Sequence, residues 1–262
     1  MDVIIQPDAE SAALLSARLV RDALIAKPRL VLGLATGRTM EAVYRNLAER
    51  RRTENLDFSG CATFNLDEYV GLPPECPESY RQYMEWHLFR HVNLRSGNTR
   101  LPDGTASDLK AECRGYEDAI REAGGIDLQL LGIGSDGHIG FNEPLSAFQS
   151  RTRVTCLTPA TIAQNAPLFP DPEQMPRRAI TMGVGTILEA RRCLMLVTGE
   201  AKAEIVAAAV EGPMTAMISA SALQLHPHCT VIVDEAAATG LRGADHYRWV
   251  FANDPQWEPY RE

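Results

Sequence analysis

Short apolar runs alternate with amphipathic helical patterns along most of this chain. The apolar runs predict buried strands over residues 30–35, 61–66, 126–134, 193–199 and 229–235. Apolar residues at helical spacing predict helices over residues 8–26, 39–51, 77–91, 107–123 and 201–212. Strands and helices in alternation are typical of βαβ units, whose strands form a parallel sheet with helices on both faces. The sequence therefore predicts an α/β fold with a mainly parallel sheet.

A single domain is expected over residues 1–262. The sequence contains no internal repeat, low-complexity tract or linker, and α/β folds reach this length with one core. Residues 157–176 include five prolines, which make a long regular helix unfavourable there. We expect this segment to form a lid or a surface loop.

Composition and charge exclude several classes of function. The formal net charge of −8 argues against nucleic acid or an anionic membrane as the main partner. No stretch approaches the ~18 consecutive apolar residues of a membrane helix, and the first residues lack the pattern of a signal peptide. The six cysteines are scattered without a C-x-x-C pair, which is typical of reduced thiols in a cytoplasmic protein.

The first expected strand ends in the sequence ATGRT, residues 35–39. Backbone N–H groups at the start of the following helix, with the hydroxyls of Thr36 and Thr39, would form a cradle for a phosphate group. Gly37 and Arg38 lie between the two threonines. A tight turn with an N-cap threonine explains the same residues equally well. The pattern is neither a Walker A loop nor G-x-G-x-x-G, so a nucleotide is not indicated.

The second expected strand leads into Asp67. A carboxylate at the end of a buried strand is partly desolvated, and desolvation raises its pKa toward that of a useful general base. A capping or turn aspartate is the structural alternative. The adjacent Glu68 is expected to be an ordinary polar residue or a support for its neighbour.

The third site is the glycine-rich sequence LGIGSDGHIGFNEP, residues 131–144. His138 can carry a proton near neutral pH, and Asp136 or Glu143 could hold one ring nitrogen. Glycines such as Gly137 let the backbone approach a ligand closely. A capped turn with a satisfied histidine is the structural alternative, but three such groups within eight residues at a strand end favour function.

The fourth site is Lys202, which is expected in the first turn of a helix. The helix dipole disfavours a cation there unless an anion binds between the helix start and the ammonium group. A solvated surface lysine is the alternative. Two other pairs, His87 with His91 and His226 with His228, have metal-like spacing without the remaining ligands, so no metal site is expected.

Taken together, these motifs resemble the glucosamine-6-phosphate deaminase (isomerase) family. The sequences LGLATGRT, FNLDEYVGL, LGIGSDGHIGFNEP and the AKA–AAVEG helix occur in the same order and spacing, from about residue 30 to residue 235. The resemblance implies a single Rossmann-like domain and a reaction that needs no metal or organic cofactor. The implied reaction converts glucosamine 6-phosphate and water to fructose 6-phosphate and ammonia.

The resemblance also implies roles for the candidate residues. Asp67 would remove the C2 proton, and His138 would open the pyranose ring by acting at O5 and O1. Asp136 and Glu143 would tune and orient that histidine. The implied substrate- and phosphate-binding residues are Thr36, Gly37, Arg38, Thr39, Gly137 and Lys202. The family contains both hexamers and monomers, so a homo-oligomer is compatible with the sequence.

Several other functions compete with the implied deaminase activity. The alternatives are a deaminase or isomerase of another amino-sugar phosphate, such as galactosamine 6-phosphate, a 6-phosphogluconolactonase-like hydrolase, and a non-catalytic sugar-phosphate sensor.

The sequence departs from the family pattern at several positions. Arg38 stands where many relatives have glycine or serine, and Ile162 stands where some have arginine. Residues 165–169 read NAPLF where the family typically has NARFF. Thr155 replaces the lysine of allosteric relatives, so activation by N-acetylglucosamine 6-phosphate is not expected.

Overall fold

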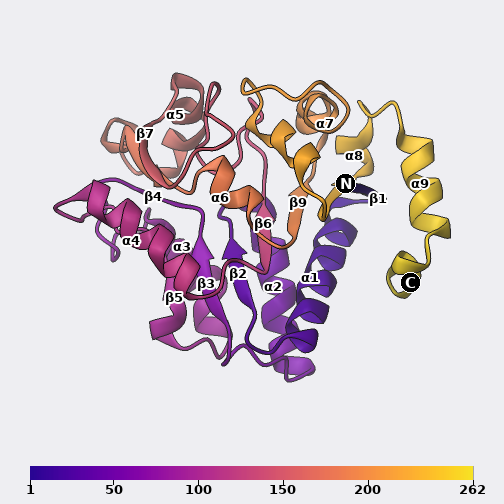
Figure 1. Cartoon of the computed structure of the whole chain (residues 1–262), viewed down its shortest axis with the longest axis horizontal. Helices are drawn as coiled ribbons and strands as arrows, with labels where there is room; N and C mark the ends of the chain where they lie inside the picture. The colour runs from indigo at the N-terminus through magenta and orange to yellow at the C-terminus, as the bar shows by residue number, and fades with distance from the viewer. Residues whose placement is uncertain (262) are drawn as a thin grey trace.

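A seven-stranded parallel sheet forms the centre of the protein in the computed structural model, which describes residues 1–261 (Figure 1). Its strand order is β1-β10-β9-β6-β2-β3-β5, and every neighbouring pair is parallel. The strands of this sheet are β1 (Asp2–Gln6), β2 (Val31–Leu34), β3 (Ala62–Asn65), β5 (Thr99–Arg100), β6 (Leu128–Leu131), β9 (Cys193–Val197) and β10 (Cys229–Asp234).

The sequence of the central strands explains their position. Every residue of β9 (CLMLV) and of β10 (CTVIVD) is buried, although successive side chains point to opposite faces. Both faces of the sheet are therefore covered, as continuous apolar runs in parallel strands require. The prediction of an α/β fold with a mainly parallel sheet is confirmed.

Helices connect the strands and cover the sheet. The α-helices are α1 (Ala9–Ala26), α2 (Arg38–Thr53), α3 (Tyr80–His87), α4 (Leu109–Glu122), α5 (Pro159–Asn165), α6 (Val184–Leu188), α7 (Ala203–Val210), α8 (Glu235–Ala238) and α9 (Ala244–Asn253). Asp8 and Asp108 cap α1 and α4 by accepting hydrogen bonds from backbone N–H groups of the first turn. Helices α1 and α2 pack against each other, and Tyr116 of α4 packs edge-on against Phe64 of β3.

A second, three-stranded antiparallel sheet lies beside the central one. It has the order β4-β8-β7 and consists of β4 (Asp67–Tyr69), β7 (Arg153–Cys156) and β8 (Arg178–Thr181). A small apolar cluster joins this sheet to the proline-rich segment and contains Tyr69, Phe141, Leu157, Phe169, Met175 and Ala179. The proline-rich segment therefore packs against Tyr69, the residue that follows Asp67 and Glu68.

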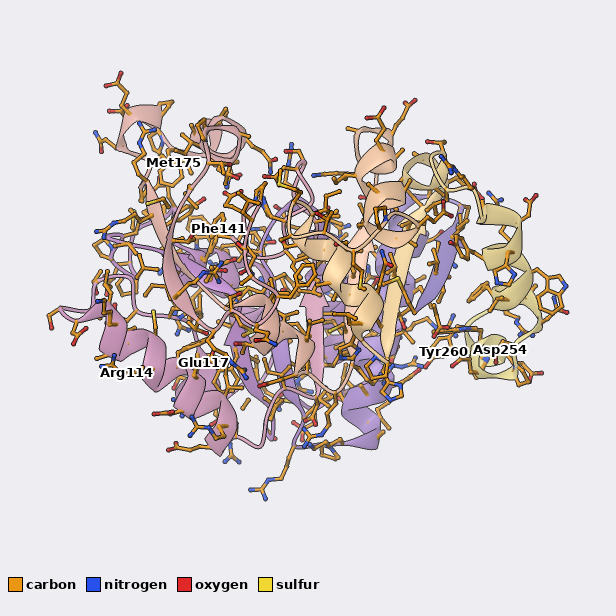
Figure 2. All side chains as sticks on the ribbon, turned by 45° about the horizontal axis from the view of Figure 1, so that its top comes forward. Arg114, Glu117, Phe141, Met175, Asp254 and Tyr260 are labelled. Atoms are coloured by element: carbon orange, nitrogen blue, oxygen red, sulfur yellow. The ribbon has the colours of Figure 1, made fainter. Side chains whose placement is uncertain are left out.

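The C-terminal segment returns to the first helix. Helix α9 is followed by a 3-10 helix, Pro255–Tyr260, whose Trp257 is buried. The Tyr260 hydroxyl donates a 2.8 Å hydrogen bond to Asp22 of α1. Figure 2 shows Asp254 and Tyr260 at the opposite end of the molecule from Phe141 and Met175, so the C-terminal segment is remote from that apolar cluster.

The differences from the predicted elements have physical reasons. Strands β4, β7 and β8 have only three or four residues, and β7 (RVTC) has no buried residue, so neither periodicity nor apolar content marks it. The expected helix over residues 77–91 is shorter, because α3 ends at His87. Residues 157–176 form no long helix: they contain α5 and the 3-10 helices Ala166–Leu168 and Pro172–Gln174. Within residues 1–261, no helix is both long and apolar enough to cross a membrane.

Candidate active site

Four neighbouring strands, β9, β6, β2 and β3, have their carboxyl ends at one edge of the central sheet. Parallel strands in an open sheet bind ligands at this edge. A cavity of about 520 Å³ lies there. The predicted site residues that line it are Thr36, Gly37, Arg38, Thr39, Asp67, His138 and Lys202. Segments more than 160 residues apart in sequence thus contribute to one site.

The ATGRT segment forms a loop between β2 and the N-terminus of α2. Gly37 has a φ of +116°, a conformation that side chains rarely allow, and α2 begins at the next residue. The first N–H groups of a helix have no partner within the helix, so they are available to an anion in the cavity. The side chain of Arg38 is exposed at the edge of the cavity.

Asp67 is the first residue of β4 and lies in the wall of the cavity. Its side chain is buried, with 6% of the residue exposed. Burial and, to a smaller extent, the charge of Glu68 raise the pKa of Asp67 to about 8, against the opposing effect of His138. A carboxyl group in this range exchanges protons near neutral pH, which suits a general base.

Glu68 supports the position of its neighbour. Its carboxylate accepts hydrogen bonds from the backbone N–H groups of Tyr69, Tyr80 and Arg81, at 2.8, 3.0 and 3.0 Å. These bonds tie β4 to the start of α3. Of the two expectations for Glu68, the structure favours a supporting role.

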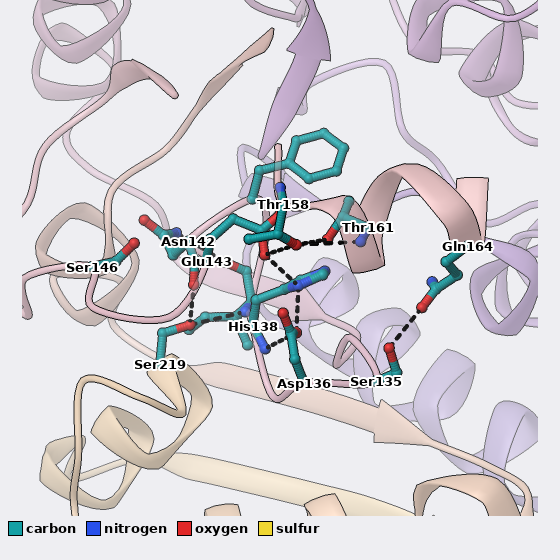
Figure 3. A network of polar contacts seen from close by, with 12 residues as sticks. Ser135, Asp136, His138, Asn142, Glu143, Ser146, Thr158, Thr161, Gln164 and Ser219 are labelled. Carbon is teal, nitrogen blue, oxygen red and sulfur yellow. Dashed lines mark hydrogen bonds and ion pairs between the residues drawn. The ribbon is translucent and has the colours of Figure 1, made fainter. Parts of the chain in front are cut away.

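His138 packs directly on a glycine of its own loop. A Cβ at Gly134 would lie 2.4 Å from the imidazole ring, so only glycine leaves room for the ring there. The ring nitrogen Nδ1 lies 2.6 Å from Asp136 Oδ1 and 3.4 Å from Glu143 Oε2 (Figure 3). Burial opposes the charged ring, but the two carboxylates outweigh it and raise the pKa of His138 to about 9.

The two carboxylates are themselves held in place. Asp136 accepts a 3.2 Å hydrogen bond from the backbone N–H of His138, and Glu143 accepts two 3.2 Å bonds from the backbone N–H and the hydroxyl of Thr158 (Figure 3). Burial opposes ionisation of Asp136, but its contacts with His138 prevail and lower the pKa of Asp136 to about 2. Because Thr158 caps α5, the histidine site is connected to the proline-rich segment.

Asp136, His138 and Glu143 also form the one group within residues 1–261 whose ligand atoms are close enough to hold a metal ion. The 2.6 Å distance between Nδ1 and Oδ1 is that of an ion pair between the imidazolium and the carboxylate. Two ligands that each bind zinc at about 2.1 Å lie farther apart than this, so the present geometry favours the ion pair. His226 is structural: one ring nitrogen lies 2.7 Å from the Ala190 carbonyl, and the other accepts a hydrogen bond from the N–H of His228.

Lys202 is the last residue of the 3-10 helix Glu200–Lys202, which precedes α7. Its Nζ donates a 3.0 Å hydrogen bond to the Ile133 carbonyl, which holds the ammonium group at the cavity. Burial lowers the pKa of Lys202, Asp136 raises it, and the charge of Arg38 lowers it. Burial has the largest effect, so the pKa of Lys202 is lowered overall, and both cations line the cavity.

Gly137 is the one predicted binding residue that the structure places away from the cavity. Its φ is +88°, and a Cβ there would lie 2.6 Å from Ile218 and 2.9 Å from Ile205. Its carbonyl accepts a hydrogen bond from the Ala220 N–H. The residue is required for a turn that packs on the core, so the expected ligand contact does not fit its position.

Several cavity residues were not predicted from the sequence. These are Tyr69, Tyr80, Tyr83, Gln164 and Asn165. The Tyr69 hydroxyl accepts 3.3 and 3.2 Å hydrogen bonds from Tyr80 and Asn165, and Ser135 donates a 3.0 Å bond to Gln164 (Figure 3). Tyr80 and Tyr83 lie three residues apart on a helix, and this spacing was the one sequence signal for a role in the cavity. The same spacing equally indicates a helix face that packs on the core.

Comparison with known proteins places this geometry in a family. Residues 7–232 match the model of the family described as glucosamine-6-phosphate isomerases/6-phosphogluconolactonase. The chain is 48% identical over 258 residues to a glucosamine-6-phosphate deaminase of Arthrobacter sp. (strain FB24), covering 98% of this chain and 99% of the relative. It is 50% identical over 259 residues to the deaminase of Streptomyces coelicolor, with the same coverage.

Solved structures give a consistent picture. A monomeric glucosamine-6-phosphate deaminase matches with a TM-score of 0.90 and 44% identity, over 92% of this chain and 100% of the other. A 6-phosphogluconolactonase from Thermotoga maritima matches with a TM-score of 0.72 and 21% identity, over 89% and 99%. The second likeness concerns the fold alone.

Proposed function

The chain belongs to the family of glucosamine-6-phosphate isomerases and 6-phosphogluconolactonases, and we propose that it is a glucosamine-6-phosphate deaminase. The substrates are glucosamine 6-phosphate and water, and the products are fructose 6-phosphate and ammonia. The observation that carries the proposal is the presence of Asp67, His138 and the helix N-terminus of α2 in one cavity. The near-full-length identity to named deaminases supports it.

The reaction begins with opening of the sugar ring. With a pKa of about 9, His138 is a cation at neutral pH and can donate a proton to the ring oxygen O5. The same nitrogen then takes the proton from the hydroxyl on C1, which becomes an aldehyde. Asp136 and Glu143 both contact Nδ1, so Nε2 is the nitrogen left for the substrate.

Isomerisation and deamination follow on the open chain. The Asp67 carboxylate removes the C2 proton while His138 returns its proton to O1, and the proton on Asp67 is then delivered to C1. C1 is thereby reduced to the alcohol and C2 is oxidised to a protonated imine. Water adds to the imine carbon, ammonia leaves, and the released proton returns to His138. The proposed chemistry uses acid–base groups alone and assigns no role to a metal or cofactor.

The phosphate group is proposed to bind between the ATGRT loop and Lys202. Backbone N–H groups at the start of α2, the two threonine hydroxyls and the two cations supply the contacts. Residues 157–176, the proposed lid, contain no lysine, arginine or histidine. The positive charge that binds the phosphate therefore comes from outside the lid, including Arg38 of the ATGRT loop.

Replacement of Arg38 with glycine tests this assignment. In residues 1–261 no protein group forms an ion pair or hydrogen bond with the Arg38 side chain, so the change removes no internal contact of the protein. We expect KM for glucosamine 6-phosphate to rise about three- to tenfold, the loss of one exposed charge contact, with kcat within about twofold. Arg45→Gly, an exposed site on the same helix but outside the cavity, is the matched control. An unchanged KM in Arg38→Gly would remove the residue from the phosphate site.

The test of the proposed function is ammonia release from two amino-sugar phosphates, run beside an assay for hydrolysis of 6-phosphogluconolactone, which contains no nitrogen. We expect turnover of glucosamine 6-phosphate, with galactosamine 6-phosphate and 6-phosphogluconolactone as the rival substrates. Lactone opening needs no C2 base, so a site built for it has no use for Asp67 in a desolvated position. Hydrolysis of the lactone with no release of ammonia from either amino-sugar phosphate would show that the chain is a lactone hydrolase and not a deaminase.

The remaining expectations follow from the same proposal. The proposed site is formed by residues of one chain, and a homo-oligomer is compatible with the sequence. A similar solved deaminase is described as monomeric. We propose a cytoplasmic location, which the six free cysteines support. The substrate is a small amino-sugar phosphate rather than nucleic acid or membrane.

A further inference from the structure

Two tyrosine hydroxyls hold backbone carbonyls of the ATGRT loop. Tyr83 of α3 donates a 2.8 Å hydrogen bond to the carbonyl of Gly37. Tyr44 of α2 donates a hydrogen bond to the carbonyl of Ala35. The Gly37 carbonyl also accepts a 2.9 Å bond from the Met40 N–H. The carbonyls on either side of Thr36 are thus both engaged.

The position of Tyr83 fixes the direction of the neighbouring N–H group. All peptide bonds in residues 1–261 are trans, so the Arg38 N–H points opposite to the Gly37 carbonyl. Helix α3 follows β3 and β4 and lies on one side of β2, whereas Lys202 and Ile133 follow β9 and β6 on the other side. A carbonyl turned toward Tyr83 therefore directs the N–H toward the side of Lys202.

Besides the bond from Tyr83, the first-turn helix bond from the Met40 N–H holds the Gly37 carbonyl. Gly37 has a φ of +116°, and no atom lies within 4 Å of the place where its Cβ would be. Glycine adopts both signs of φ readily, so steric contacts do not hold its peptide, and the Met40 bond and the Tyr83 bond are what oppose its rotation. A rotated peptide would present the carbonyl oxygen, a partial negative charge, to the phosphate in place of a donor.

We propose that Tyr83 is a positioning residue for the phosphate group of the substrate. Its hydroxyl adds a second bond to the helix bond from Met40, so that the peptide between Gly37 and Arg38 keeps its N–H toward the anion and its carbonyl turned away from the anion. The inference rests on the proposed role of the ATGRT loop in phosphate binding. Tyr83 acts through the backbone and takes no part in proton transfer.

Tyr83→Phe is the variant that tests the inference. Phenylalanine keeps the ring, which packs on His87 with centroids 4.4 Å apart, and removes only the hydroxyl. We expect KM for glucosamine 6-phosphate and Kd for inorganic phosphate, measured by calorimetry, both to rise about three- to tenfold, the range of one net hydrogen bond. The kcat value should stay within about twofold, because the hydroxyl is assigned no part in proton transfer.

Tyr116→Phe is the matched control. Its hydroxyl also donates to a backbone carbonyl, that of Asn65 at 2.7 Å, but it does not line the cavity. We expect a lower unfolding temperature with KM and phosphate Kd unchanged. Wild-type values of both constants in Tyr83→Phe would overturn the inference. A wild-type protein that binds phosphate but releases no ammonia would overturn the proposed reaction instead, and the phosphate Kd of the variant would still decide the role of Tyr83.

Discussion

Replacement of Asp67 with asparagine is expected to lower kcat for ammonia release by at least about 10³-fold, within the range assigned to general acid–base catalysis. The amide has nearly the shape of the carboxyl group but cannot accept the C2 proton. KM should change little, because the phosphate contacts lie elsewhere in the cavity. The measurement is steady-state ammonia production near pH 8, where the wild-type carboxyl group is substantially ionised. Activity within tenfold of wild type would exclude Asp67 as the base.

The same variant has an expected effect on stability that separates catalysis from misfolding. The folded pKa of Asp67, about 8, lies above the ordinary value, so the folded state binds the proton more tightly than the unfolded state. Between its ordinary pKa and about 8, each rise in pH therefore weakens the wild-type fold. Asparagine does not ionise, so Asp67→Asn should unfold at a higher temperature than wild type above pH 8, with a smaller difference at pH 5. A variant that is less stable at both pH values would indicate disruption of the site.

The strand ends were predictable because they follow from topology. In a parallel sheet, residues after each strand meet at one edge, and this alone brings Asp67, His138 and Lys202 to one cavity. The pattern of apolar runs locates β9 and β10 because every residue of both strands is buried. A three-residue strand such as β4 carries no such signal.

The details of the site depend on contacts between distant segments, which periodicity does not encode. Gly134 and Gly137 look alike in the sequence, yet one lies beneath the imidazole and the other packs on Ile205 and Ile218. Tyr83 reads as part of an apolar helix face, but its hydroxyl reaches Gly37, 46 residues earlier. The sequence therefore marks the residues proposed for proton transfer, but not Tyr83 or the different surroundings of the two glycines.

Replacement of His138 with glutamine is expected to lower kcat by about 10²- to 10³-fold, because ring opening loses its proton donor. Glutamine can still form hydrogen bonds in the space over Gly134, so the loss reports on proton transfer rather than on an empty pocket. In the wild type, kcat/KM should rise with pH as Asp67 ionises near pH 8 and fall as His138 loses its proton near pH 9. The falling limb should be absent in His138→Gln. An unaltered falling limb would assign it to another group.

Stability gives an independent check of the histidine, with a sign opposite to that of Asp67. The folded pKa of His138 lies above its ordinary value, so the imidazolium stabilises the fold fully below about pH 6.5 and loses this effect as the pH rises through about 9. His138→Gln should therefore unfold at a lower temperature than wild type at pH 6, and the difference should shrink toward pH 9.5. His246→Gln, at an exposed position on α9, is the control and should match wild type throughout. A difference that grows with pH would mean that the ring is neutral in the folded protein, and the proton for O5 would then have to come from another group.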